Sequence, residues 1–263
     1  MVATGTSAPL VYITGASSGI GQALAAHFRA AGWRLALVAR RVAETEAWCR
    51  QQGWPEDSWA VYGADVRDTD AAVAAGHACL ARQGLPDAVI ANAGVSIGVD
   101  TAEREDLEVF RTVMDTNLLG MAASFHPFLK PLRERRRGTL VGIASVAAIR
   151  GLPGHGAYCA SKAGVVSYCE SLRGELRACG VRVVTIVPGY VATPLTAGNT
   201  YGMPFMLAPE DFAERAFRAI AAGRSYTVLP WQMGIVAKLM RMLPNALFDR
   251  LFAGRGRKKR LGE

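Results

Sequence analysis

The sequence predicts an α/β fold, in which helices cover both faces of a single doubly wound parallel sheet. Short apolar segments alternate with segments of helical periodicity about 10–15 residues long, which is typical of parallel strands joined by crossover helices. The apolar segments are almost continuously hydrophobic, as expected for strands buried on both faces. The chain has 263 residues, of which 51% are hydrophobic and 20% charged, and this composition suits one globular domain rather than a disordered chain.

The first half of the chain contains four of the expected strands. Each is a short apolar run followed by a turn and a helical segment. The strands are expected at residues 10–13, 34–39, 59–62 and 88–91. The helices are expected at residues 22–31, after the second strand through residue 49, at 70–82, and as one long helix over 107–129.

The second half continues the alternation. Further strands are expected at residues 139–144, 181–187 and 226–229, with helices at 158–179 and 209–222. From residue 231 the character changes, because apolar residues at helical spacing are interrupted by basic residues and by Pro244. We therefore divide the chain into a main domain, residues 1–230, and an amphipathic C-terminal extension with a basic tail, residues 231–263.

The net charge of +8 is concentrated near the C-terminus. Without the five basic residues of the tail, the chain would carry only +3. These residues are Arg255, Arg257, Lys258, Lys259 and Arg260. The excess is therefore local, and we expect no nucleic-acid partner.

The cysteines and the N-terminus predict a cytoplasmic protein. The chain has five cysteines without a Cys-x-x-Cys pair, so we expect reduced thiols, no disulfide framework and no metal site. The N-terminal segment lacks the pattern of a signal peptide. No uncharged apolar run reaches the length of about 18 residues that a membrane-spanning helix needs.

A glycine-rich turn between the first strand and the first helix predicts a phosphate-binding loop. Glycines let the backbone turn tightly and approach a pyrophosphate, and free N–H groups at the start of the helix bind the anion. The spacing Gly-x3-Gly-x-Gly is a weak signal alone, and a plain structural turn is the alternative. The loop residues are Gly15, Ser17, Ser18, Gly19, Ile20 and Gly21.

The end of the second strand predicts NADPH rather than NADH. A carboxylate there would hold the ribose 2′-hydroxyl of NAD, whereas an arginine accommodates the 2′-phosphate of NADP. Arg40 and Arg41 stand at this position, and the planar guanidinium suits a phosphate. The alternative is two solvated arginines. After the third strand, Asp65 could accept from an adenine amino group beside Val66, or serve only as a turn residue.

Tyr158 and Lys162 are candidate catalytic residues. Four residues apart on an expected helix, they share one face. Reducing a carbonyl requires a proton, and an ammonium near the phenol should lower its pKa and favour exchange. Ser145 follows a strand, where active-site residues of parallel sheets lie, and could bond the substrate oxygen. Asn117 lies in the long helix and could have a structural role only.

Taken together, these motifs resemble the classical short-chain dehydrogenase/reductase family over roughly residues 8–230. The motifs occur in the family's order, although Ala91 replaces a frequent second asparagine. They are Thr14-Gly-x3-Gly-x-Gly21, Asp65, Asn92-Ala93-Gly94, Asn117, Ser145, Tyr158-x3-Lys162 and Pro188-Gly189.

The resemblance implies a Rossmann-type domain and roles for the site residues. Ser145, Tyr158 and Lys162 would form a catalytic triad. Asn117 would extend it to a tetrad through a water linked to Lys162, and Lys162 would also bind the nicotinamide ribose beside Tyr158. Asn92, Ala93 and Gly94 would support the cofactor-binding strand. The nicotinamide would be flanked by Pro188, Gly189, Val191 and Thr193.

The resemblance also implies a substrate loop at residues 195–207 and a homodimer or homotetramer. Apolar residues in this loop favour an apolar or lipid-like carbonyl substrate. The alternative is a loop whose apolar residues pack only on their own core. The extension from residue 231 could pack on the body or on another subunit, or its apolar face and basic tail could contact an anionic membrane surface on the cytoplasmic side. The alternative to an enzyme is a non-catalytic NADP-binding regulator on the same fold.

Overall fold

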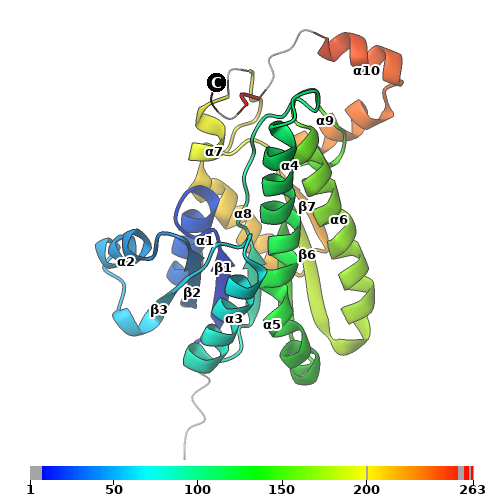
Figure 1. Ribbon diagram of the computed structural model, residues 1–263. Coiled ribbons are helices and arrows are strands. Elements are labelled where there is room, and N and C mark those ends of the chain that lie inside the picture. The colour runs from blue at the N-terminus through cyan, green and yellow to red at the C-terminus, as the bar shows by residue number, and fades with distance from the viewer. Residues whose placement is uncertain (1–7, 200, 254–257, 261, 263) are drawn as a thin grey trace, which may run out of the picture.

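The computed structural model describes residues 8–199, 201–253, 258–260 and 262. In this part of the chain seven parallel strands form one sheet in the order β3-β2-β1-β4-β5-β6-β7 (Figure 1). The strands are β1 (Leu10–Thr14), β2 (Arg34–Ala39), β3 (Trp59–Gly63), β4 (Ala88–Ala91), β5 (Gly138–Ile143), β6 (Val181–Pro188) and β7 (Tyr226–Leu229). The order runs outward in both directions from β1 and β4, which confirms the doubly wound fold.

Helices cover both faces of the sheet. One face carries α3 (Thr69–Gln83), α5 (Gly120–Arg135) and α6 (Gly156–Leu176), and the other carries α1 (Gly19–Ala30), α2 (Val42–Gln51) and α8 (Pro209–Ala221) (Figure 1). Alternate residues of a strand point to opposite faces, so β1 contributes to two cores. Tyr12 packs edge-on against Phe128 of α5 with ring centroids 4.8 Å apart, whereas Val11 and Ile13 pack with Phe28 of α1.

The reversal of strand order between β1 and β4 positions the functional site. On one side of β1, Thr14 lies opposite Val38 of β2; on the other, Ile13 lies opposite Ile90 of β4. The connections after β1 and β4 leave to opposite faces of the sheet, so a crevice opens beyond their carboxyl ends. Ligands of open α/β sheets bind at such a point.

The prediction of a single long helix over residues 107–129 is wrong in detail. The segment consists of α4 (Asp106–Met114), a π-helical turn, η2 (Asp115–Leu119), and α5, which continues to Arg135. A π turn inserts one extra residue into the helical repeat, so the apolar periodicity of the sequence does not reveal it. Asn117 lies in this turn and is buried.

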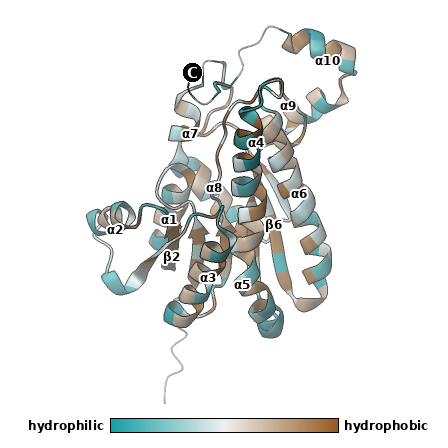
Figure 2. Cartoon of the chain, in the orientation of Figure 1, coloured by the Kyte–Doolittle hydropathy of each residue, from teal (hydrophilic) through white to brown (hydrophobic). Residues whose placement is uncertain are grey.

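The C-terminal extension forms α9 (Trp231–Met242) and α10 (Asn245–Phe252), which Figure 1 shows beyond the carboxyl end of the sheet. Met233 and Ala237 of α9 are buried against the body, and α10 buries Phe248. Figure 2 shows both hydrophilic and hydrophobic residues on α10. Large apolar side chains remain exposed on both helices, namely Trp231, Ile235, Leu239, Met242, Leu247 and Leu251.

These exposed side chains do not identify a partner. Within the described residues, no helix is both long and apolar enough to cross a membrane. Contact with an anionic membrane surface stays a prediction, which flotation with anionic liposomes would test. Of the basic tail, Arg255 and Arg257 lie outside the described residues.

Candidate active site

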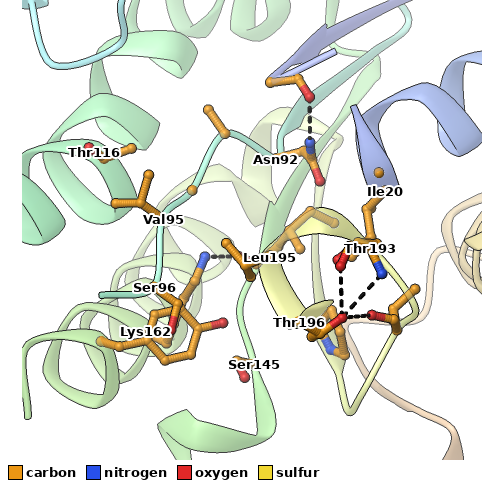
Figure 3. Close-up of a pocket in the computed structure, with 18 of the residues that line it drawn as sticks. Ile20, Asn92, Val95, Ser96, Thr116, Ser145, Lys162, Thr193, Leu195 and Thr196 are labelled. Atoms are coloured by element: carbon orange, nitrogen blue, oxygen red, sulfur yellow. Dashed lines mark hydrogen bonds between the residues drawn. The ribbon is translucent and has the colours of Figure 1, made fainter. Parts of the chain in front are cut away.

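A cavity of about 440 Å3 lies at the carboxyl end of the sheet and collects most of the site residues predicted from the sequence (Figure 3). Two predicted residues, Gly21 and Asn117, are not among the residues that line it. The others line it: Gly15, Ser17, Ser18, Gly19, Ile20, Arg40, Arg41, Asp65, Val66, Asn92, Ala93, Gly94, Ser145, Tyr158, Lys162, Pro188, Gly189, Val191 and Thr193.

The phosphate loop forms a narrow cradle that requires glycine. Gly15 and Gly19 have φ angles of 68° and 55°, a region that favours glycine. A Cβ atom on Gly21 would lie only 2.1 Å from the carbonyl oxygen of Gly15. Helix α1 begins here without a side-chain cap and without an acidic residue in its first turn, so its first N–H groups can bind an anion.

Asn92 ties the end of β4 to this loop. Its side-chain amide donates to the carbonyl oxygens of Thr14 and Gly15 at 3.0 and 3.2 Å. The Thr14 hydroxyl accepts from the backbone N–H groups of Asn92 and Ala93 at 3.1 and 3.2 Å. These bonds hold two neighbouring strand ends together at the floor of the cavity, as Figure 3 shows for Asn92.

Three arginines and one carboxylate surround the end of the cavity beyond β2. Arg41 donates to the Ser17 hydroxyl at 3.4 Å, and Arg40 lies 3.7 Å from the Asp65 carboxylate. Arg67 forms a two-pronged bond with the same carboxylate, 2.7 Å at its shortest, and this bond lowers the pKa of Asp65. Because both Asp65 oxygens already accept bonds, its contact with an adenine stays a prediction.

Ser145 is the first polar residue after β5 and is buried at the cavity wall. Its hydroxyl oxygen accepts from the Ala147 backbone N–H at 3.2 Å. A hydroxyl that accepts one bond still has its own proton to donate. Ser145 can therefore donate to an oxygen atom in the cavity.

Tyr158 and Lys162 project from the first turns of α6 into the same part of the cavity. The Lys162 Nζ lies 5.9 Å from the centre of the Tyr158 ring and donates to the Ile143 carbonyl oxygen at 2.8 Å. Figure 3 shows Lys162 and Ser145 at the end of the cavity away from Asn92.

Burial dominates the electrostatics of this pair. It raises the pKa of the Tyr158 phenol, a rise that a hydrogen bond with Ser145 opposes, and it lowers the pKa of Lys162 to about 8. The net lowering of the Tyr158 pKa expected from the sequence is therefore wrong for the protein without ligand. The phenol therefore keeps its proton at neutral pH.

Lys162 should reduce the stability of the ligand-free protein at neutral pH. Its pKa is about 8 in the folded chain and 10.5 in the unfolded chain, so folding penalises the charged form fully below pH 8. This penalty lowers the free energy of unfolding by about 3 kcal/mol, and it disappears as the pH rises from 8 to 10.5. We expect the excess unfolding free energy of Lys162→Met over the wild type to shrink across this range, measured by urea denaturation. Lys130→Met, on the exposed side of α5, is the control; a pH-independent difference for Lys162→Met would contradict the argument.

Asn117 positions the loop after β4. Its side-chain oxygen accepts from the Val95 N–H at 2.8 Å, and its amide donates to the Val95 carbonyl and to the Ser161 hydroxyl, both at 2.9 Å. A Cβ on Gly94 would lie 3.2 Å from this oxygen and 3.4 Å from the Lys162 Nζ. These contacts show a positioning role, and a water relay to Lys162 stays a prediction.

The structure adds residues that the sequence argument did not assign to the site. The His155 imidazole lies 3.2 Å from the Tyr201 hydroxyl, and burial lowers its pKa. His155 stands three residues before Tyr158, at the start of α6, where its position could have suggested a role. The cavity is also lined by Arg150, Leu152, Tyr190, Met233, Met240 and Lys258.

The sequence matches a known protein family and several of its members. Residues 9–202 match the family model described as short chain dehydrogenase. An uncharacterized oxidoreductase of Myxococcus xanthus is 40% identical over 237 residues, 90% of this chain and 93% of that protein. A sulfoacetaldehyde reductase of Chromohalobacter salexigens is 34% identical over 218 residues, 79% and 86% of the two chains.

Solved structures share the fold. A short chain dehydrogenase/reductase from Burkholderia phymatum in complex with NAD has a TM-score of 0.78 and 25% identity, and covers 89% of this chain and 92% of its own. An alcohol dehydrogenase from Thermococcus sibiricus complexed with 5-hydroxy-NADP has a TM-score of 0.72 and 28% identity, with coverage of 84% and 95%. The protein belongs to the short-chain dehydrogenase family of oxidoreductases, which act on carbonyl or alcohol groups with a nicotinamide cofactor.

Proposed function

We propose that the protein transfers hydride between NADPH and the carbonyl group of an apolar substrate, or the reverse with the corresponding alcohol. The observation that carries the proposal is the meeting of Ser145, Tyr158 and Lys162 at one end of a cavity whose other end is a glycine cradle. The division of the chain at residue 231, cytoplasmic localisation and a homodimeric or homotetrameric state stay predictions.

The residues at the cradle fit a dinucleotide. The cradle between Gly15 and Gly21 is too narrow for a Cβ atom, so backbone can approach a pyrophosphate there. Arg40 and Arg41 supply guanidinium groups at the end of β2, where a ribose 2′-phosphate would lie. Among relatives of known structure, one holds NAD and another 5-hydroxy-NADP, so the preference for NADPH rests on these two arginines.

The chain's own groups supply the proton and hold the substrate oxygen. A nicotinamide held at this site would supply the hydride that the carbonyl carbon accepts. The Ser145 hydroxyl donates to the carbonyl oxygen and fixes its position. Tyr158 gives its phenolic proton to the same oxygen as negative charge develops there. The Lys162 ammonium, 5.9 Å from the ring, stabilises the phenolate that remains.

Apolar side chains favour an apolar body for the substrate. Leu152, Leu195, Met233 and Met240 line the same cavity as Tyr158 and Tyr201. Apolar pockets with a few polar groups bind ligands of the same pattern. We therefore infer a ketone or aldehyde with an alkyl or ring portion.

A non-catalytic NADP-binding regulator is the alternative. A regulator would need the glycine cradle but not the three convergent groups Ser145, Tyr158 and Lys162. One of these groups, the buried Lys162, lowers the unfolding free energy of the protein. The direct test is whether the purified protein binds NADPH and uses it to reduce an apolar ketone. Binding of NADPH without turnover on any ketone would favour the regulator.

A further inference from the structure

The end of the chain returns to the cavity and is held there by an ion pair. The Arg260 guanidinium donates to both carboxylate oxygens of Asp106 at 2.7 and 3.2 Å. The Asp106 side chain is little exposed, so this pair is less screened by solvent than a fully exposed pair. The Gly98 N–H donates to the Lys259 carbonyl at 2.9 Å. Residues 258–260 are thereby fixed against the loop that follows β4.

This anchoring places the Lys258 ammonium in the cavity wall. Its Nζ donates to the Asn199 side-chain oxygen at 2.6 Å and to the Leu195 carbonyl at 3.1 Å, and all three residues line the cavity. An ammonium has three N–H donors, so one has no partner among the described residues. Lys258 also forms no ion pair with a carboxylate in that part of the chain.

A half-buried cation with only neutral acceptors lacks charge compensation. Burial lowers the pKa of Lys258, and the positive charge of Lys258 in turn contributes to lowering the pKa of His155. Buried charges in proteins are usually paired, because unpaired burial is costly. The nearby Arg260 follows that rule with Asp106, whereas Lys258 does not.

No carboxylate of the described cavity lining can compensate Lys258. Asp65 is the one acidic side chain among those lining residues, and it is bound by Arg67 near the other end. Of the cations near the substrate, Arg150 donates to the Leu243 carbonyl at 2.7 Å and to Asn245 at 3.1 Å. Lys162 serves the catalytic tyrosine. Among the described residues, Lys258 is therefore a cation of the cavity lining with a donor left for an entering anion.

We propose that Lys258 binds an anionic group of the substrate and determines specificity. The substrate is then an amphipathic carbonyl compound: an apolar body between the reacting carbonyl and a carboxylate, sulfonate or phosphate. This inference rests on the proposed function and narrows its substrate class. The cofactor's own phosphates share this chemistry and are the other source of an anion near Lys258.

Binding of a non-reacting anion separates the inference from the proposed function. Octanoate has no carbonyl that can be reduced, and its binding to the protein saturated with NADP is measured by calorimetry. We expect Lys258→Met to raise the octanoate Kd about tenfold, because the variant loses one hydrogen bond to a charged group. Lys258→Arg keeps a positive charge and should retain most of the affinity. Lys259→Met is the matched control, because Lys259 is adjacent and exposed. An unchanged octanoate Kd in Lys258→Met overturns the inference.

Turnover gives the second readout. With 7-oxooctanoate, Lys258→Met should raise KM about tenfold with little change in kcat, whereas with the neutral methyl ester both parameters should stay within about twofold. An equal rise in KM for the acid and for the ester would overturn the inference. A comparable rise in the NADPH Kd would also overturn it, because it would assign Lys258 to the cofactor. A shift in octanoate binding without turnover of either compound would support the anion site and contradict the proposed function.

Discussion

Replacing Tyr158 by phenylalanine is expected to lower kcat for ketone reduction by roughly a thousandfold, within the range of general acid catalysis. The variant keeps the aromatic ring and loses only the phenolic hydroxyl, with the proton that it donates. In the wild type, the phenol carries this proton at neutral pH, because its ordinary pKa is near 10 and burial raises it further. The NADPH Kd should stay within about twofold, since the phosphate cradle and the arginines are untouched.

Tyr168→Phe is the matched control for this substitution. Tyr168 lies on the same helix, α6, and packs at the edge of the core instead of lining the cavity. Its kcat should remain near the wild-type value. A Tyr158→Phe variant that keeps more than about a tenth of wild-type kcat would contradict the assignment of Tyr158 as the general acid.

Adding a methyl group to Gly21 is expected to disable the cofactor site. The new Cβ would lie 2.1 Å from the Gly15 carbonyl oxygen and 2.9 Å from the Asn92 amide nitrogen, and neither atom is the end of a flexible side chain free to move. The loop must shift, at a cost of about 1–3 kcal/mol in unfolding free energy. Misaligned N–H donors lose charge-assisted bonds to phosphate, so we expect the NADPH Kd of Gly21→Ala to rise on the order of a hundredfold.

Gly174→Ala distinguishes a steric effect from a general effect of glycine replacement. Gly174 lies in α6 and is exposed, and a Cβ there meets no atom within 4 Å. The substitution should raise the unfolding free energy by about 0.5–1 kcal/mol, because alanine favours helix, and should leave NADPH binding unchanged. Wild-type NADPH affinity in Gly21→Ala would show that the loop tolerates a side chain and does not hold the pyrophosphate.

The sequence predicts the sheet closely because its signals are local. Each expected strand overlaps the observed one within one or two residues, since the apolar runs are bounded by glycine, proline or polar turns. The meeting of Ser145, Tyr158 and Lys162 in one cavity was predictable for a related reason. Tyr158 and Lys162 share one helical face, and Ser145 follows a strand whose end meets the other strand ends at one edge.

Features that depend on tertiary contacts were not predictable. The π turn at Asn117 leaves the helical pattern almost unchanged. The direction in which the Tyr158 pKa shifts depends on how deeply the folded chain buries the phenol. No local pattern in the sequence predicts that burial. Lys258 reads in the sequence as one residue of a basic tail. Only the fold shows that Asp106, more than 150 positions earlier, fixes this tail at the cavity.

Titration of the purified protein with NADPH and with NADH, followed by turnover on ketones of increasing chain length, shows whether the protein is an NADPH-dependent ketone reductase. Nicotinamide fluorescence reports binding, and its loss on adding ketone reports hydride transfer. We expect NADPH to bind at least about tenfold more tightly than NADH, because one bidentate arginine contact to the 2′-phosphate is sufficient for that difference. We also expect turnover to increase with the apolar length of the ketone. Equal affinity for the two cofactors would contradict the role of Arg40 and Arg41, and tight binding without turnover on any ketone would contradict the catalytic account.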